Sequence, residues 1–186
     1  MSTLKVSTIS PLGTDATKTI TLGESGGTLG IASGAKTSGF GKVGQVVSTF
    51  KNDTFGTSSS SLVDITGFSA SITPSTTSSK ILIYVCGGVS SGTGGHNVLL
   101  SLLRDSTEIG QGTGGGTSNN FLITNMAANS DVIFFGHHFL DSPSTTSSTT
   151  YKLQMASTSG TAQLNRRADT SARTMGSSIT LMEILD

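Results

Sequence analysis

One phrase occurs twice in this sequence, and it constrains the fold more than any other feature. Residues 72–85 read ITPSTTSSKILIYV, and residues 141–155 read DSPSTTSSTTYKLQM. In each copy a proline and a series of Ser and Thr precede a strand-like apolar stretch. Proline fixes φ and cannot donate to a central ladder, so it marks the turn before the strand. We therefore expect two strands, about seventy residues apart, to begin in a similar way.

Short apolar stretches continue from Val43 to the C-terminus and are separated by Ser, Thr and Gly. Their length and spacing are typical of a β-sandwich or barrel. The stretch LLSLLR could form a short helical turn, but RDST followed by EIGQG favours a hairpin with Asp105 and Ser106 at its tip. The sequence predicts an all-β protein with a jelly-roll-like antiparallel β-sandwich head over residues 43–186.

Residues 1–41 differ from this head. Their apolar residues come in very short groups between glycines, too few to bury a core. We expect an extended N-terminal attachment arm that orders against partner subunits or another protein. The alternative is a terminus without fixed structure.

Composition argues against several classes of function. Charged residues make up 12% of the chain, the formal net charge is zero and the pI is near 6.8. A nucleic-acid or membrane-surface binder would carry a basic excess, so we expect neither partner. With a single cysteine, Cys86, the chain has no disulfide framework, and its apolar neighbours favour a packed, inert thiol. With no signal peptide or membrane span visible, we expect synthesis in the host cytoplasm and no membrane insertion.

The candidates for chemistry are weak. The glycine-rich stretches 87–97 and 110–116 lack the Lys-Ser/Thr ending of a phosphate loop. His137 and His138 are neighbours on a predicted strand and should point to opposite faces, so they cannot easily share a metal. Carboxylates are scarce, and no nucleophile elbow occurs. We expect no catalytic residue, no cofactor and no metal.

The last predicted strand, residues 177–185, is apolar on both faces apart from Glu183. One face can join the core, and the other then needs a second cover, because an exposed apolar strand invites association. We expect a homotrimer whose subunit interface uses the apolar residues of this strand: Ile179, Leu181, Met182, Ile184 and Leu185.

Arg166, Arg167 and Arg173 lie close together in the sequence RRADTSAR. Because arginine binds carboxylate and phosphate groups well, they could form a receptor contact for an acidic glycan or a lipid phosphate. The alternative is an ordinary surface loop with an internal ion pair to Asp169.

Several stretches together resemble a known family: GQVVSTFKNDTF, LVDITGFSASITPSTTSSKILIYV, LLRDSTEIG, FLDSPSTTSSTTYKLQM and SSITLMEI. They are similar to a domain of tail-fibre and virion structural proteins of marine tailed bacteriophages, over nearly the whole chain. The resemblance implies a non-enzymatic, trimeric virion component, either a tail fibre or appendage that contacts the host cell or a capsid-decorating protein. A tailspike enzyme is disfavoured, because it needs paired acids in a long groove.

Overall fold

The computed structural model describes residues 42–113, 120–128 and 131–185. The predicted arm, residues 1–41, lies outside the described residues. The described strands are β1 (Lys42–Lys51), β2 (Phe55–Thr57), β3 (Val63–Ile72), β4 (Lys80–Ser91), β5 (His96–Arg104), β6 (Thr107–Ile109), β7 (Leu122–Met126), β8 (Ile133–Asp141), β9 (Thr149–Ser157), β10 (Ala162–Leu164) and β11 (Ser177–Leu185).

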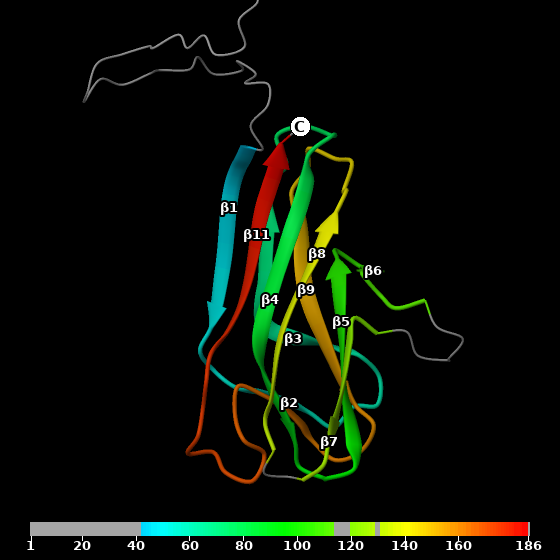
Figure 1. Ribbon diagram of the computed structural model, residues 1–186, viewed down its shortest axis with the longest axis vertical. Coiled ribbons are helices and arrows are strands. Elements are labelled where there is room, and N and C mark those ends of the chain that lie inside the picture. The colour runs from blue at the N-terminus through cyan, green and yellow to red at the C-terminus, as the bar shows by residue number, and fades with distance from the viewer. Residues whose placement is uncertain (1–41, 114–119, 129–130, 186) are drawn as a thin grey trace, which may run out of the picture. The chain divides into compact units, whose positions relative to one another are not determined.

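These strands form two antiparallel sheets (Figure 1). The six-stranded sheet has the order β1-β11-β4-β8, with short β10 and β2 continuing beside the end of β4. The five-stranded sheet has the order β3-β9-β5, and both β6 and β7 pair with β5. Numbering only the eight longer strands in chain order gives 1-8-3-6 in one sheet and 2-7-4-5 in the other. This is the jelly-roll arrangement, which confirms the predicted fold class.

The core lies between the two sheets and follows strand alternation. Ile81, Ile83 and Val85 of β4 are fully buried, as are Leu153 and Met155 of β9 on the facing sheet. Because side chains alternate across a strand, every second residue of these strands points into the sandwich. The intervening residues form the two outer faces of the molecule.

The hairpin at Asp105 and Ser106 is confirmed. β5 ends at Arg104 and β6 begins at Thr107, so LLSLLR is strand rather than helix. Asp105 has a φ of 53°, a left-handed conformation that Asp tolerates in tight turns. Its carboxylate accepts a 2.9 Å bond from the backbone N–H of Thr150, which ties the turn to β9.

The two copies of the repeated phrase form matching loops. Residues 73–79 connect β3 to β4, and residues 142–148 connect β8 to β9. Each loop therefore crosses from one sheet to the other. Ile72 pairs with Thr149, and Ile81 pairs with Asp141, so both crossings lie at the same end of the sandwich.

Glu183 holds the first of these loops to the six-stranded sheet. Its carboxylate is 1% exposed and accepts bonds of 2.6 and 2.7 Å from the backbone N–H and hydroxyl of Ser75, and one of 2.8 Å from Gln45. Burial by itself would raise the pKa of Glu183, but these hydrogen bonds outweigh it and lower the pKa to about 2. The one acidic residue of β11 thus anchors a loop.

A buried ionic network lies beneath the second loop. Arg104 Nη1 is 3.0 Å from both carboxylate oxygens of Asp141, and the Tyr151 hydroxyl donates to the same carboxylate at 2.7 Å. Burial raises the pKa of Tyr151, and the hydrogen bond that its hydroxyl donates to Asp141 raises this pKa further. The network joins β5, β8 and β9, so it holds the two sheets together at this end.

Candidate interaction surface

The outward-pointing residues of the six-stranded sheet form a largely apolar surface. Cross-strand pairs such as Val46–Met182, Met182–Leu82 and Leu82–Leu140 run straight across the four long strands. We call this surface the outer face, and it comprises Val46, Ser48, Phe50, Leu82, Tyr84, Cys86, Phe134, His138, Leu140, Ser178, Thr180, Met182 and Ile184.

Exposed large apolar side chains concentrate here. Seven are exposed among the described residues, and Ile123 is the one that lies on the other sheet. Phe134 is 74% exposed and Phe50 69%. From a strand spacing of about 4.8 Å and a rise of about 3.4 Å per residue, the outer face covers roughly 500 Å². Apolar patches of about this size on soluble proteins are often functional.

The polar atoms of the outer face bond to one another. The hydroxyls of Ser48 and Thr180 are 2.8 Å apart, and the Cys86 thiol is 3.2 Å from the Ser178 hydroxyl. The rings of Tyr84 and His138 stack at 6.0 Å. Because the hydroxyls of Ser48 and Thr180 already share a hydrogen bond, covering them would not leave these two groups buried without a hydrogen-bond partner. The face is therefore suited to burial against another surface.

The structure divides the predicted subunit interface between the two sides of β11. Ile179 and Leu181 are fully buried in the core of the sandwich, which corrects the expectation for these two residues. Met182 and Ile184 are half-buried on the outer face, and Leu185 is half-buried at the end of the strand. Of the five predicted interface residues, these three are the ones that remain available for a subunit contact.

The outer side of the five-stranded sheet is polar. Asp64 of β3 accepts hydrogen bonds of 2.7 Å from both Lys152 and Gln154 of β9. The bond from Lys152 is the larger cause of the lowered pKa of Asp64, and the bond from Gln154 adds to it. Asn125 of β7 donates to Asn97 of β5 at 2.9 Å. Charged and amide side chains thus lie along this surface, beside one apolar cross-strand pair, Leu99–Ile123.

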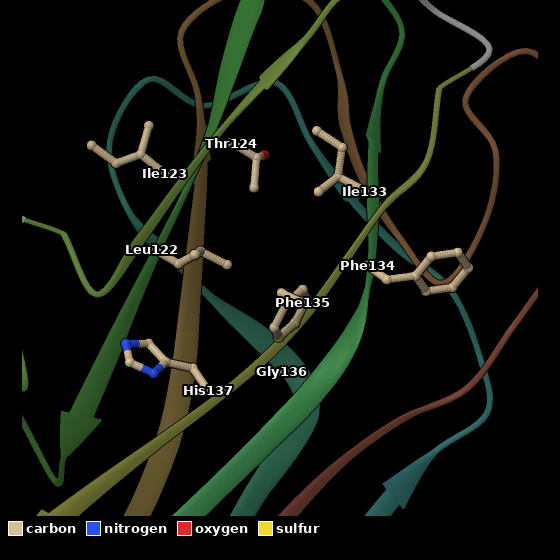
Figure 2. Close-up of a pocket in the computed structure, with 8 residues that line it drawn as sticks. All are labelled: Leu122, Ile123, Thr124, Ile133, Phe134, Phe135, Gly136 and His137. Carbon is tan, nitrogen blue, oxygen red and sulfur yellow. The ribbon is translucent and has the colours of Figure 1, made fainter.

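A groove lies between β7 and β8, the edge strands of the two sheets. Its cavity volume is about 540 Å³, and it is lined by residues 122–124 of β7 and 133–137 of β8. Figure 2 shows Leu122 and Thr124 facing Ile133 and Phe135, while Phe134 points away toward the outer face. We call this the β7–β8 groove.

His137 and His138 lie on opposite faces of β8, as predicted. His137 lines the β7–β8 groove and stacks on Phe121 at 4.4 Å, whereas His138 stacks on Tyr84. Within the described ranges, no three His, Cys, Asp or Glu residues are grouped to hold a metal ion. A search of the same residues finds no helix long and apolar enough to span a membrane.

The three arginines lie in one loop, in which the backbone N–H of Arg167 donates to the carbonyl of Arg173 at 3.2 Å. Arg167 forms a 2.6 Å ion pair with Asp169, which is the internal pair that the alternative predicted. Arg166 donates from Nε to the carbonyl of Arg167 at 3.2 Å, and Arg173 is exposed. A receptor contact here stays a prediction, and Arg173 is the residue most open to it.

Sequence reasoning found the part of the outer face on β11 but missed the parts on β1, β4 and β8. The stretch KILIYVC is apolar on both faces, a pattern typical of a central strand that is covered on both sides. It is central, yet within the described residues only its inner side is covered: Tyr84 is 50% exposed, and Leu82 and Cys86 are half-buried. The apolar pattern on both faces of this stretch could have indicated the missed part, because the second face of such a strand also has to be covered.

The sequence matches no protein-family model and no curated protein. Among solved structures, it is similar to the infectious bursal disease virus Gx strain (12% identity, TM-score 0.42, 86% of this chain and 41% of that chain). It is also similar to the structure of the Gt strain (11% identity, TM-score 0.42, 86% of this chain and 42% of that chain). A third similar structure is a mutant VP2 protein of that virus in derived T=1 particles. It is 14% identical with a TM-score of 0.40, and the match covers 84% of this chain and 40% of that chain. The chain spans about two fifths of these chains, and likeness at this level carries no conclusion about function.

Proposed function

We propose that this protein is a structural subunit of a bacteriophage virion that assembles into a homotrimer through its outer face. The trimer forms a tail fibre or appendage that contacts the host cell. The observation that supports assembly is the outer face, an apolar surface of roughly 500 Å² by strand geometry on an otherwise polar sandwich. Burying one large apolar side chain contributes about 1.5–3 kcal/mol, so covering several is strongly favourable.

A second copy of the chain fits this surface best. The thirteen outer-face residues carry no formal charge when His138 is neutral, and one exposed charge, Lys80, lies beside Ile184 at the end of β4, so a partner needs little complementary charge there. What it needs is an apolar sheet surface of similar size, and in a trimer three such surfaces can meet around the rotation axis. Every neighbouring copy brings such a sheet.

The virion assignment and the number of copies rest on the family resemblance of the sequence. A standard interface buries about 800 Å² per partner, more than the roughly 500 Å² of the outer face, so we expect further contacts from elsewhere in the chain. The loop that carries Arg173 remains available for a host surface in this arrangement.

The assembly is tested by placing charge on the outer face of the full chain. In Val46→Asp/Leu140→Asp both substituted side chains are about half exposed in one chain, at 55% and 48%, so the fold should persist. We expect light scattering to find trimer in the wild type and monomer in this variant. The matched control is Thr107→Asp, an exposed position on β6. A wild type that stays monomeric at micromolar concentration would refute the proposal.

The place in the particle is tested by labelling. Gold-labelled antibody against the chain should decorate the tails of intact virions in electron micrographs. Uniform decoration of the heads would instead assign the protein to the capsid surface and overturn the fibre proposal.

A further inference from the structure

β8 is an open edge of the six-stranded sheet. It pairs with β4 over its full length without a register shift, and among the described strands nothing pairs with its other side. The backbone N–H of His138 donates to Nδ1 of the preceding His137 at 3.0 Å and therefore points away from β4. In an antiparallel ladder, Phe134 and Gly136 present their N–H and C=O groups on that same side.

This edge lacks the usual protection against pairing. Protected edges carry prolines, lysines or bulges, and β8 (IFFGHHFLD) has no proline, lysine or register shift. The opposite edge, β1, is irregular between Val43 and Val46. At the centre of the open edge, a Cβ added to Gly136 would meet nothing within 4 Å. A further backbone can therefore approach β8 closely at this point.

The β7–β8 groove supplies the side-chain half of a strand-binding site. A strand added to β8 would continue the sheet, and every second side chain would point inward toward Ile133, Phe135 and Leu122. The groove lining is apolar except for Thr124 and His137, and it contains no carboxylate, lysine or arginine. It is suited to an extended segment with uncharged apolar residues at alternate positions.

We propose that an extended segment from residues 1–41 of a neighbouring copy binds in the β7–β8 groove as an additional strand on β8. Residues 1–41 contain three matching stretches in which apolar residues alternate with other residues: Leu4/Val6, Ile20/Leu22 and Leu29/Ile31. The groove involves five consecutive residues of β8, which is long enough to hold any one of these three-residue stretches with one flanking residue on each side. This inference rests on the proposed self-assembly, and it supplies the additional contact area which that assembly requires.

The sheet order favours a neighbour as the source. Residues 1–41 lead into β1, which lies at the opposite edge of the six-stranded sheet from β8 (Figure 1). Lys42 also starts at the end of the sheet near Asp141, whereas the groove lies at the Ile133 end of β8. When identical subunits surround a rotation axis, one edge of each faces the opposite edge of the next. A segment leaving the β1 edge then starts beside the neighbour's β8.

A photo-crosslinking experiment on the full chain tests this. Phe134 is replaced by p-benzoylphenylalanine, which resembles it in shape, and the chain is co-assembled with an excess of ¹⁵N-labelled wild type. We expect ultraviolet light to join light peptides around position 134 to heavy peptides from residues 1–41. The same amino acid at Phe50, exposed on the outer face near the β1 edge, is the matched control and should give no such product.

The outcomes separate this inference from the proposed assembly. A trimer without crosslinks to residues 1–41 would overturn the inference and leave the assembly intact. Crosslinks to light arm peptides alone would show that each chain uses its own arm, which also overturns it. A chain that remains monomeric refutes both. As a second measurement, Gly136→Pro removes an edge N–H, and hydrogen exchange within residues 1–41 of the assembled protein should become faster.

Discussion

The two outer surfaces of this sandwich have the same architecture and opposite chemistry. On the five-stranded sheet, neighbouring strands are joined by ion pairs and amide bonds such as Asp64–Lys152 and Asn97–Asn125. On the six-stranded sheet, the corresponding positions carry Val46, Leu140 and Phe134, and the few hydroxyls bond to each other. The fold requires neither choice, because only the inner faces build the core. The difference fits the proposed assembly, in which one surface meets water and the other meets a neighbouring subunit.

The comparison implies that the polar surface contributes little to folding, and the largest expected effect tests this against the interior. Asp141→Ala leaves Arg104 and Tyr151 without their buried partner, and losing such a partner costs about 3–5 kcal/mol. Asp64→Ala breaks an exposed pair on the five-stranded sheet and should cost less than about 1 kcal/mol. Urea unfolding of both variants measures the difference. Equal losses would mean that the polar surface is part of the fold's stability.

A smaller effect concerns acid. The pKa of Glu183 is about 2 in the fold against an ordinary 4.5, so its contribution is complete above pH 4.5 and is lost as the pH falls toward 2. Glu183→Gln should lower the unfolding free energy at pH 7 by about 2 kcal/mol and make stability depend less on pH between these values. The matched control, Glu108→Gln, changes an exposed carboxyl on β6 of the other sheet. An unchanged acid profile in Glu183→Gln would show that other groups govern acid unfolding.

Salt should have a still smaller effect on assembly. Contacts between exposed charges weaken as ionic strength rises, whereas apolar burial does not. Raising NaCl from about 0.05 to about 0.5 M should therefore leave the trimer dissociation constant within about twofold, measured by analytical ultracentrifugation. A steep loss of affinity with salt would place the subunit contact on the charged surface and reverse the comparison.

The smallest expected effect on assembly comes from the arginine loop. Arg166→Ala/Arg167→Ala/Arg173→Ala should leave the trimer intact, because these residues lie outside the outer face. If the loop contacts the host, virions carrying the variant should adsorb more weakly to cells in a binding assay. Loss of the trimer in this variant would show that the arginines have a structural role.

The sequence allowed the strand content, the hairpin at Asp105 and the turns of the repeated phrase to be predicted, because each depends on local turn chemistry. The side of β11 that faces the core could not be predicted. Ile179 and Met182 lie in a stretch that is apolar on both faces, and only pairing with β4 and β1 fixes which of them is buried. The β7–β8 groove could not be predicted from the sequence either, because it lies between edge strands of two different sheets. The Arg167–Asp169 ion pair could be predicted from the sequence, because its two residues lie only two positions apart.

The position of the chain's one cysteine has a practical consequence. Cys86 lies half-buried on β4, between β11 and β8, and its thiol contacts Ser178. A thiol-reactive dye would modify it slowly in a single chain and more slowly still when a second subunit lies over β4. The unmodified protein thus carries its own reporter of association. The rate of thiol labelling, followed against protein concentration, gives the assembly equilibrium without any substitution.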